Sequence, residues 1–190
     1  MKNQKMADQI VNEKQTETKK QEENVMRIPK ITRVVLSAGA VDKELEKAKK
    51  LLELITEKKA QITKSGSRTR IPAFGVKPKM ELGTCVTLRG KEAIEILRRL
   101  LGAIDNQLKE SQIDKNNFSF GVHEYINIPG MKYVREIGIR GFNVTVVFER
   151  AGVRVKRRKI KSGRVPAKQH VTKEEIIDYM KNTFKTGVRA

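Results

Sequence analysis

Two basic stretches without a single acidic residue are the feature of this sequence that most restricts how the chain can fold. The first, residues 58–80, contains seven Lys and Arg residues, and the second, residues 150–168, contains nine. Unopposed like charges repel one another and are costly to bury, so neither stretch can belong to an apolar core. The core must come from the segments around them, and the two stretches are expected to be loops or strand extensions at its edges.

The overall charge favours a polyanionic partner. The chain carries 41 Lys and Arg against 22 Asp and Glu, a formal net charge of +19. Such a charge attracts nucleic acid or anionic lipid. A membrane is the weaker alternative, because no apolar run approaches the roughly 18 residues of a span and no secretory signal is visible. Two solvated, disordered loops are the other explanation of the basic stretches.

Short apolar patterns predict strands on either side of the basic stretches. Residues 29–38 are rich in strand-forming residues and end at Gly39, and residues 84–88 form a second such run. Residues 118–122 and 144–148 alternate between apolar and other side chains, which is typical of half-buried strands.

Three apolar stripes at helical spacing predict helices. The first spans residues 41–55 with Asp42 as its cap, and the second spans residues 93–108. The third begins at Thr172, which has capping-box spacing to Glu175. Strands and helices in this order predict an α+β fold, an antiparallel (mixed) sheet with helices packed on one face.

The sequence predicts one domain, residues 27–190, preceded by a disordered or weakly ordered tail, residues 1–26. The tail is electrically neutral, with five Lys against five acids, and it has no aromatic residue. It cannot bury enough apolar surface to offset the entropy lost on ordering. A short helix that docks on a partner is the alternative.

No group of residues predicts catalysis, a metal site or a cofactor. His123 and His170 have no Cys or His neighbour at metal-ligand spacing, and His123 is expected to be a packing or surface residue of a strand. Cys85 is expected to be a small, buried strand residue without the base that a catalytic thiol needs. As the single cysteine it cannot form an internal disulfide, which fits a reducing, cytoplasmic compartment. The protein is therefore predicted not to be an enzyme.

Seven phrases of the sequence, taken in order, resemble a known family. They are residues 33–40, 74–76, 86–90, 117–122, 128–130, 136–141 and 171–175. Their order and spacing closely resemble those of the archaeal form of the large-subunit ribosomal protein family numbered five, the 5S rRNA binder. The resemblance runs from about Met26 to Phe184.

The resemblance implies an α+β fold, an antiparallel sheet backed by helices, and a place in the large subunit of the cytoplasmic ribosome. It implies binding to 5S rRNA and to an adjacent 23S rRNA element in the central protuberance, beside neighbouring large-subunit ribosomal proteins. It also implies that a loop reaches the P-site tRNA. A non-specific RNA chaperone and an RNA-modifying enzyme are the alternatives from other classes.

Phe74 and Thr87 match contact positions of the family, whereas Ser37 and Lys58 replace its usual Asn and Gln. Phe74 either stacks on an exposed base or lies in the core, and Thr87 either bonds a ribose hydroxyl or simply favours a strand. The expected rRNA-binding residues are Ser37, Lys58, Thr63, Phe74, Thr87, Arg89, Arg154, Arg157, Arg158, Lys159 and Arg164. The loop expected to contact tRNA carries Lys64, Arg68, Arg70, Lys77 and Lys79.

Overall fold

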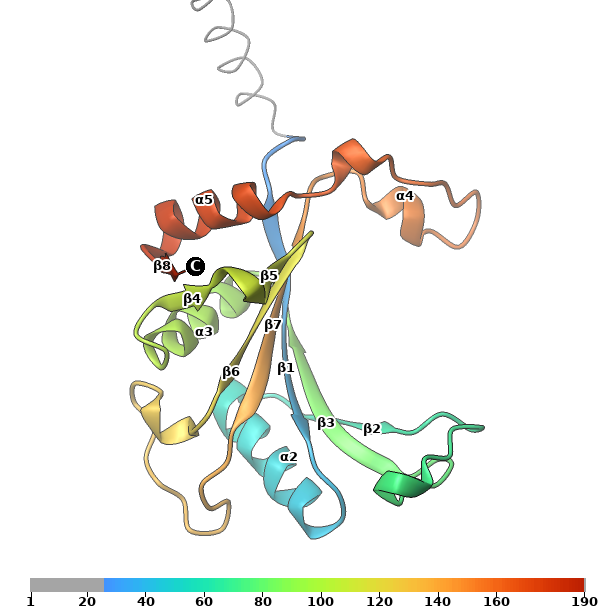
Figure 1. The fold of residues 1–190 in the computed structure, drawn as a ribbon, viewed down its shortest axis with the longest axis vertical. Coiled ribbons are helices and arrows are strands. Elements are labelled where there is room, and N and C mark those ends of the chain that lie inside the picture. The colour runs from blue at the N-terminus through green and yellow to red at the C-terminus, as the bar shows by residue number, and fades with distance from the viewer. Residues whose placement is uncertain (1–25, 190) are drawn as a thin grey trace, which may run out of the picture.

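A six-stranded sheet organises the computed structural model, which describes residues 26–189 (Figure 1). The predicted tail, residues 1–26, lies outside the described residues except for Met26. The strand order is β2-β3-β1-β7-β6-β5, and every neighbouring pair is antiparallel. The strands are β1 (Lys30–Gly39), β2 (Gln61–Lys64), β3 (Glu81–Leu88), β5 (Ile113–Asp114), β6 (Asn117–Val122) and β7 (Phe142–Glu149). A separate parallel pair joins β4 (Gln107–Lys109) to β8 (Gly187–Arg189).

Three helices, α2 (Lys43–Thr56), α3 (Lys91–Gly102) and α5 (Lys173–Phe184), lie on the same side of the sheet in Figure 1. The α+β fold with an antiparallel sheet and helices on one face is therefore confirmed. The predicted capping box is present as well, because the Thr172 amide donates to the Glu175 carboxylate and the Glu175 amide to the Thr172 hydroxyl. Shorter helical turns are α4 (Arg154–Arg157), η1 (Pro72–Phe74), η2 (Glu110–Gln112), η3 (Tyr125–Asn127) and η4 (Ala167–Gln169).

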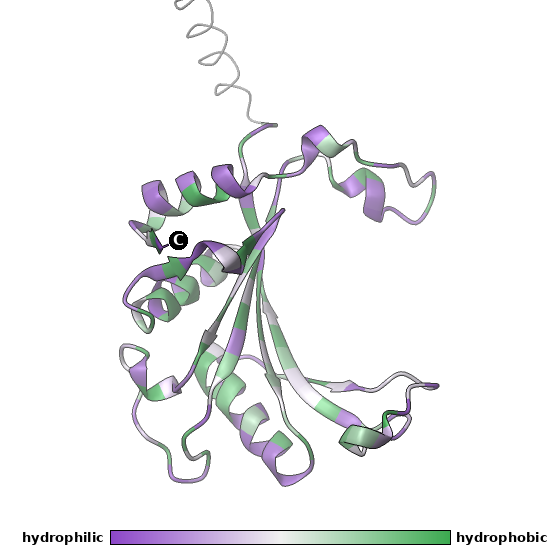
Figure 2. Ribbon diagram, viewed as in Figure 1, coloured by the Kyte–Doolittle hydropathy of each residue, from purple (hydrophilic) through white to green (hydrophobic). Residues whose placement is uncertain are grey.

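The core lies between these helices and the sheet. Alternate residues of the central strands face the helices, among them Leu36, Phe118 and Phe148, all fully buried. The rings of Phe118 and Phe148 lie 5.9 Å apart between centroids. On the helical side Leu51 and Leu97 are equally buried, and Figure 2 shows hydrophobic residues recurring along these strands and helices. Burying each large apolar side chain contributes about 1.5–3 kcal/mol, so this layer holds the helices to one face.

The second helix is shorter than predicted. α3 ends at Gly102, and Asp105 and Asn106 then take the left-handed conformation, with φ of 55° and 54°. Leu108 is buried, at 1% exposure, but it lies in β4 opposite Val188 of β8. Its apolar character therefore reflects burial in the same core after a turn, and the sequence pattern extended the helix too far.

Four further details differ from the predictions. Val41 precedes α2 and is 39% exposed, and Asp42 has a φ of 52° and makes no side-chain cap. His123 lies in a bend beyond the end of β6 and not in the strand, although its exposure agrees with the prediction of a surface residue. Cys85 is half-buried, because its neighbours Thr84 and Val86 occupy the inward-facing positions of β3.

Candidate nucleic-acid interface

The side of the sheet that faces away from the helices is lined with small polar side chains. In antiparallel strands, residues directly opposite each other point to the same side. Ser37 lies opposite Cys85 and Asn143, and Val35 lies opposite Thr87 and Thr145. The outward residues are exposed or half-buried. We call this surface the open face and define it as Arg33, Val35, Ser37, Gln61, Thr63, Cys85, Thr87, Asn117, Ser119, Asn143 and Thr145.

The open face suits RNA chemically. Its hydroxyl and amide groups can both donate and accept hydrogen bonds, which matches ribose 2′-hydroxyls, base edges and phosphate oxygens. Among the residues of the open face, the one charged side chain is that of Arg33. The carboxylates on this side of the sheet lie at its margins, Asp114 opposite Asn117 and Glu149 at the end of β7.

The first basic stretch joins α2 to β3 and has a hydrogen-bonded base. The Ser65 amide donates to the Met80 carbonyl (2.7 Å), and the Ser65 hydroxyl donates to the Lys77 carbonyl (2.7 Å). At the tip, Ile71 and Val76 form an isolated antiparallel bridge. These bonds give the stretch a defined path, contrary to the alternative of a structureless loop.

Phe74 lies at that tip and is 82% exposed, so the alternative of a core phenylalanine is wrong. It ends the turn η1, and Gly75 follows with a φ of 64°. This left-handed conformation is one that glycine adopts at no steric cost. The local backbone therefore presents an aromatic ring to the outside between the basic residues Arg70 and Lys77, both of them exposed.

The second basic stretch joins β7 to α5, and its two ends are hydrogen-bonded to each other. The Gln169 side-chain amide donates to the Ala151 carbonyl, and an Arg150 guanidinium NH donates to the Lys168 carbonyl (2.9 Å). Figure 1 shows both basic stretches projecting from the side of the sheet opposite α2, α3 and α5.

The basic residues of the second stretch have different roles. The Arg150 side chain is 11% exposed and forms an ion pair with Glu175 of α5, so it anchors the stretch to the domain. Arg157 pairs with Glu149 at the end of β7. Arg154, Arg158, Lys159 and Arg164 are exposed and available to solvent anions.

The structure brings together some of the predicted rRNA-binding residues and separates others. Ser37, Thr63 and Thr87 share the open face, with Arg89 exposed just beyond β3. Lys58 follows the end of α2 and is ion-paired with Glu92 of α3.

Sequence reasoning missed several polar residues of the open face: Arg33, Gln61, Asn117, Ser119, Asn143 and Thr145. They occupy the outward positions of the strands whose inward positions predicted the core. The same two-residue period could have identified them.

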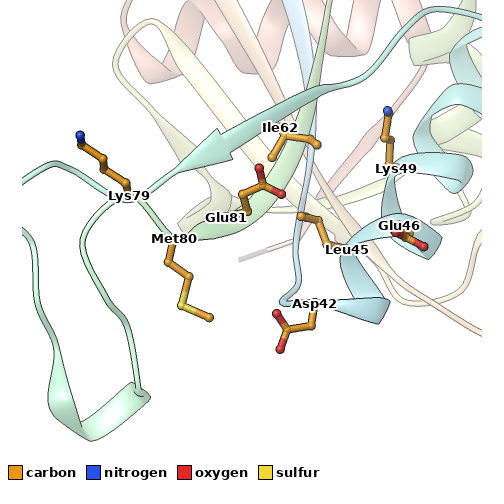
Figure 3. Close-up of a pocket in the computed structure, with 8 residues that line it drawn as sticks. All are labelled: Asp42, Leu45, Glu46, Lys49, Ile62, Lys79, Met80 and Glu81. Carbon is orange, nitrogen blue, oxygen red and sulfur yellow. The ribbon is translucent and has the colours of Figure 1, made fainter.

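The pocket beside α2 has a mixed charge that does not suit a polyanion. A pocket of about 580 Å³ lies between the start of α2 and the strands β2 and β3, where Asp42, Glu46 and Glu81 mix with two lysines (Figure 3). Its carboxylates disfavour a phosphate. Over residues 26–189 no group of three or more His, Cys, Asp and Glu side chains could hold a metal ion, and no helix is long and apolar enough to cross a membrane.

One ion pair links α2 to the loop that precedes β7. The Lys50 ammonium donates to the Glu136 carboxylate (2.9 Å), which raises the pKa of Lys50 and lowers the pKa of Glu136. Both side chains are exposed, so water screens the interaction and it adds little to stability.

Comparison with known proteins identifies matches over most of the chain. The family described as "Ribosomal protein L5" matches residues 24–77, and the C-terminal region of the ribosomal L5 family matches residues 81–179. The protein named large ribosomal subunit protein uL5 in Methanosphaera stadtmanae is 38% identical over 168 residues, which cover 87% of this chain and 99% of the relative. Proteins of the same name in Nanoarchaeum equitans (40% over 160 residues, 83% and 94%) and Sulfolobus acidocaldarius (39% over 170 residues, 87% and 94%) are similar.

The anchoring role of Arg150 predicts a specific loss of stability. Arg150→Ala removes the ion pair with Glu175 and the bond to the Lys168 carbonyl, and should lower the free energy of unfolding by about 1–3 kcal/mol. Arg154→Ala removes an exposed charge from the same stretch and should change it by less than about 0.5 kcal/mol. Chemical denaturation measures both values, and equal losses would show that Arg150 is no anchor.

Proposed function

Because the chain belongs to the ribosomal protein L5 family, we propose that it binds 5S rRNA and an adjacent 23S rRNA element in the central protuberance. Family membership makes the chain a structural component of the large ribosomal subunit, with ribosomal RNA as its partner, and not an enzyme. The observation that carries the finer proposal is the position of the open face between the two basic stretches. The second stretch follows Glu149, which lies opposite Lys30 at the start of β1, and the first stretch leads to β3 beside Gly39 at the end of β1.

This arrangement divides the work of binding between two kinds of surface. Exposed Lys and Arg side chains of the stretches neutralise phosphates, which gives affinity and a steep dependence on salt. The uncharged groups of the open face contact sugars and bases, which gives selectivity. If about six phosphates are neutralised, log K against log salt should have a slope near −4 to −5.

The proposed rRNA contacts follow from this division. Ser37, Thr63 and Thr87 bond riboses or bases from the open face, and Phe74 stacks on an unpaired base. Ser37 reaches less far than the Asn usual in the family. However, Asn143 lies directly opposite it on β7 and offers a side-chain amide at the same position along the strands. Arg89 and the second stretch contact phosphates through Arg154, Arg157, Arg158, Lys159 and Arg164.

The first basic stretch is proposed to reach the P-site tRNA as well. Lys64 lies 3.0 Å from the Glu81 carboxylate and is partly neutralised. Between residues 64 and 79, the remaining charges belong to Arg68, Arg70, Lys77 and Lys79, which are all exposed. Neighbouring large-subunit proteins complete the proposed set of partners.

Cys85 provides a direct test of the open face, because it is the only cysteine of the chain and lies between Ser37 and Gln61. 5S rRNA should slow its alkylation by a maleimide severalfold, since bound RNA covers the face. Duplex DNA and unrelated structured RNA at equal nucleotide concentration should protect it weakly. Equal protection by all three nucleic acids would favour a non-specific RNA chaperone, and cleaved or modified 5S rRNA would favour an enzyme.

Phe74→Ala should weaken 5S binding by about 1–3 kcal/mol, the value of one stacked base. The stability of the Phe74→Ala variant should equal that of the wild type, because the ring is 82% exposed. Tyr133→Ala is a matched control, as it removes another exposed ring, 56% accessible, from a different loop. Filter binding gives the affinities; similar small losses in both variants would argue against stacking.

A double variant, Arg68→Gln with Arg70→Gln, tests the contact with tRNA. Two lost surface contacts to phosphate should speed dissociation of P-site tRNA from reconstituted ribosomes by about 2- to 30-fold. Binding of 5S rRNA to the free protein should change much less. Arg164→Gln with Lys159→Gln is the charge-matched control in the second stretch, and an equal effect on tRNA would refute the assignment.

A further inference from the structure

A second pocket, of about 400 Å³, lies where the second basic stretch meets the sheet. Its floor includes Arg33 of β1 and Val147 of β7, which lie opposite each other in the sheet. The pocket is also lined by Lys156 and Arg157 of α4 and by His170, two residues beyond the stretch. The pocket therefore unites three segments that are far apart in the sequence, at the end of the open face.

Positive charge dominates this pocket, and part of it has no counter-charge. Four cationic side chains line it against one carboxylate, that of Glu149. Glu149 is already paired with Arg157, and Arg150 is paired with Glu175. Within residues 26–189, the Arg33 guanidinium and the Lys156 ammonium form no ion pair or side-chain hydrogen bond. Two like charges held in one hollow are unfavourable unless an anion occupies it.

His170 adds a neutral donor in a fixed orientation. The Asn116 side-chain oxygen accepts from the Val171 amide (2.7 Å), so its amide nitrogen must donate to Nδ1 of His170 (2.8 Å). Nδ1 is therefore the acceptor, and the ring proton of the neutral histidine lies on Nε2. Asn116 itself has a φ of 64°, a conformation that Asn tolerates better than most residues.

We propose that this pocket binds one phosphodiester group of an RNA backbone, with Arg33 and Lys156 as its charged ligands and His170 as a neutral donor. The planar guanidinium of Arg33 can contact two phosphate oxygens, and the ammonium of Lys156, which lines the same pocket, adds a second positive charge. The assignment to rRNA rests on the proposed function, but the chemistry of the pocket does not. A phosphodiester held in this pocket fixes the position of the second basic stretch along its RNA. Scattered surface charges cannot do so.

Arginine side-chain NMR of the full chain tests the pocket without 5S rRNA. Single-stranded hexauridylate should shift the Nε–H resonance of Arg33 saturably, and its uncharged methylphosphonate analogue should not. Inorganic phosphate should compete only weakly. Shifts of equal size at the exposed Arg158 and Arg164 would overturn the proposal, as would an Arg33 resonance that stays unchanged. Tight binding of inorganic phosphate that excludes hexauridylate would reassign the pocket to a free anion.

Two charge-matched variants of neighbouring positions give the second readout. Lys156→Gln should weaken hexauridylate binding by about 10-fold or more, because it removes a charge-assisted hydrogen bond. Lys159→Gln removes the same charge from outside the pocket and should cost about 2-fold. Both residues are exposed, so both variants should keep the wild-type melting temperature. Equal losses would contradict the proposal that this pocket binds a phosphodiester. The proposal of specific 5S binding would still stand, because Cys85 protection tests it separately.

Discussion

The alternation of apolar and polar residues in four adjacent strands is the constraint on which the rest of the structure depends. In β1, β3, β6 and β7 the inward residues, such as Leu36 and Phe118, join the core, and the residues between them form the open face. A shift of one residue in any register would exchange the two sets. The same pattern therefore attaches the helices to one side and leaves the other free for a partner.

Charge is kept apart from this layer. The basic stretches are held mainly by neutral hydrogen bonds at their bases, such as those of Ser65 and Gln169. Ion pairs occur where a stretch meets the sheet or α5, as between Lys64 and Glu81 or Arg150 and Glu175. Outer charges such as those of Arg154, Lys159 and Arg164 are exposed to solvent, and we propose that they contact the phosphates of RNA. In the proposed mode of binding, affinity comes from the stretches, and selectivity comes from the open face, which carries almost no charge.

Periodicity predicted the strands and the capping box of α5 well, because each depends on residues close in sequence. It overestimated α3, since Leu108 reaches the core after a turn that the apolar pattern alone does not reveal. The exposure of Phe74 depends on the bridge between Ile71 and Val76, and the proposed phosphate pocket depends on contacts between distant segments. Neither feature could be derived from the local pattern of the sequence. The outward position of Asn143 and of the other polar residues of the open face could be derived from it.

The bond between Gln169 and Ala151 has a consequence for how the second basic stretch tolerates a change in length. The bond brings the end of β7 close to the start of α5, so the residues between Ala151 and Gln169 form a loop whose ends are joined. Lengthening such a loop costs little entropy once its ends are joined. An insertion or deletion there should leave β7 and α5 in place. This loop can thus change in length while the rest of the domain stays the same.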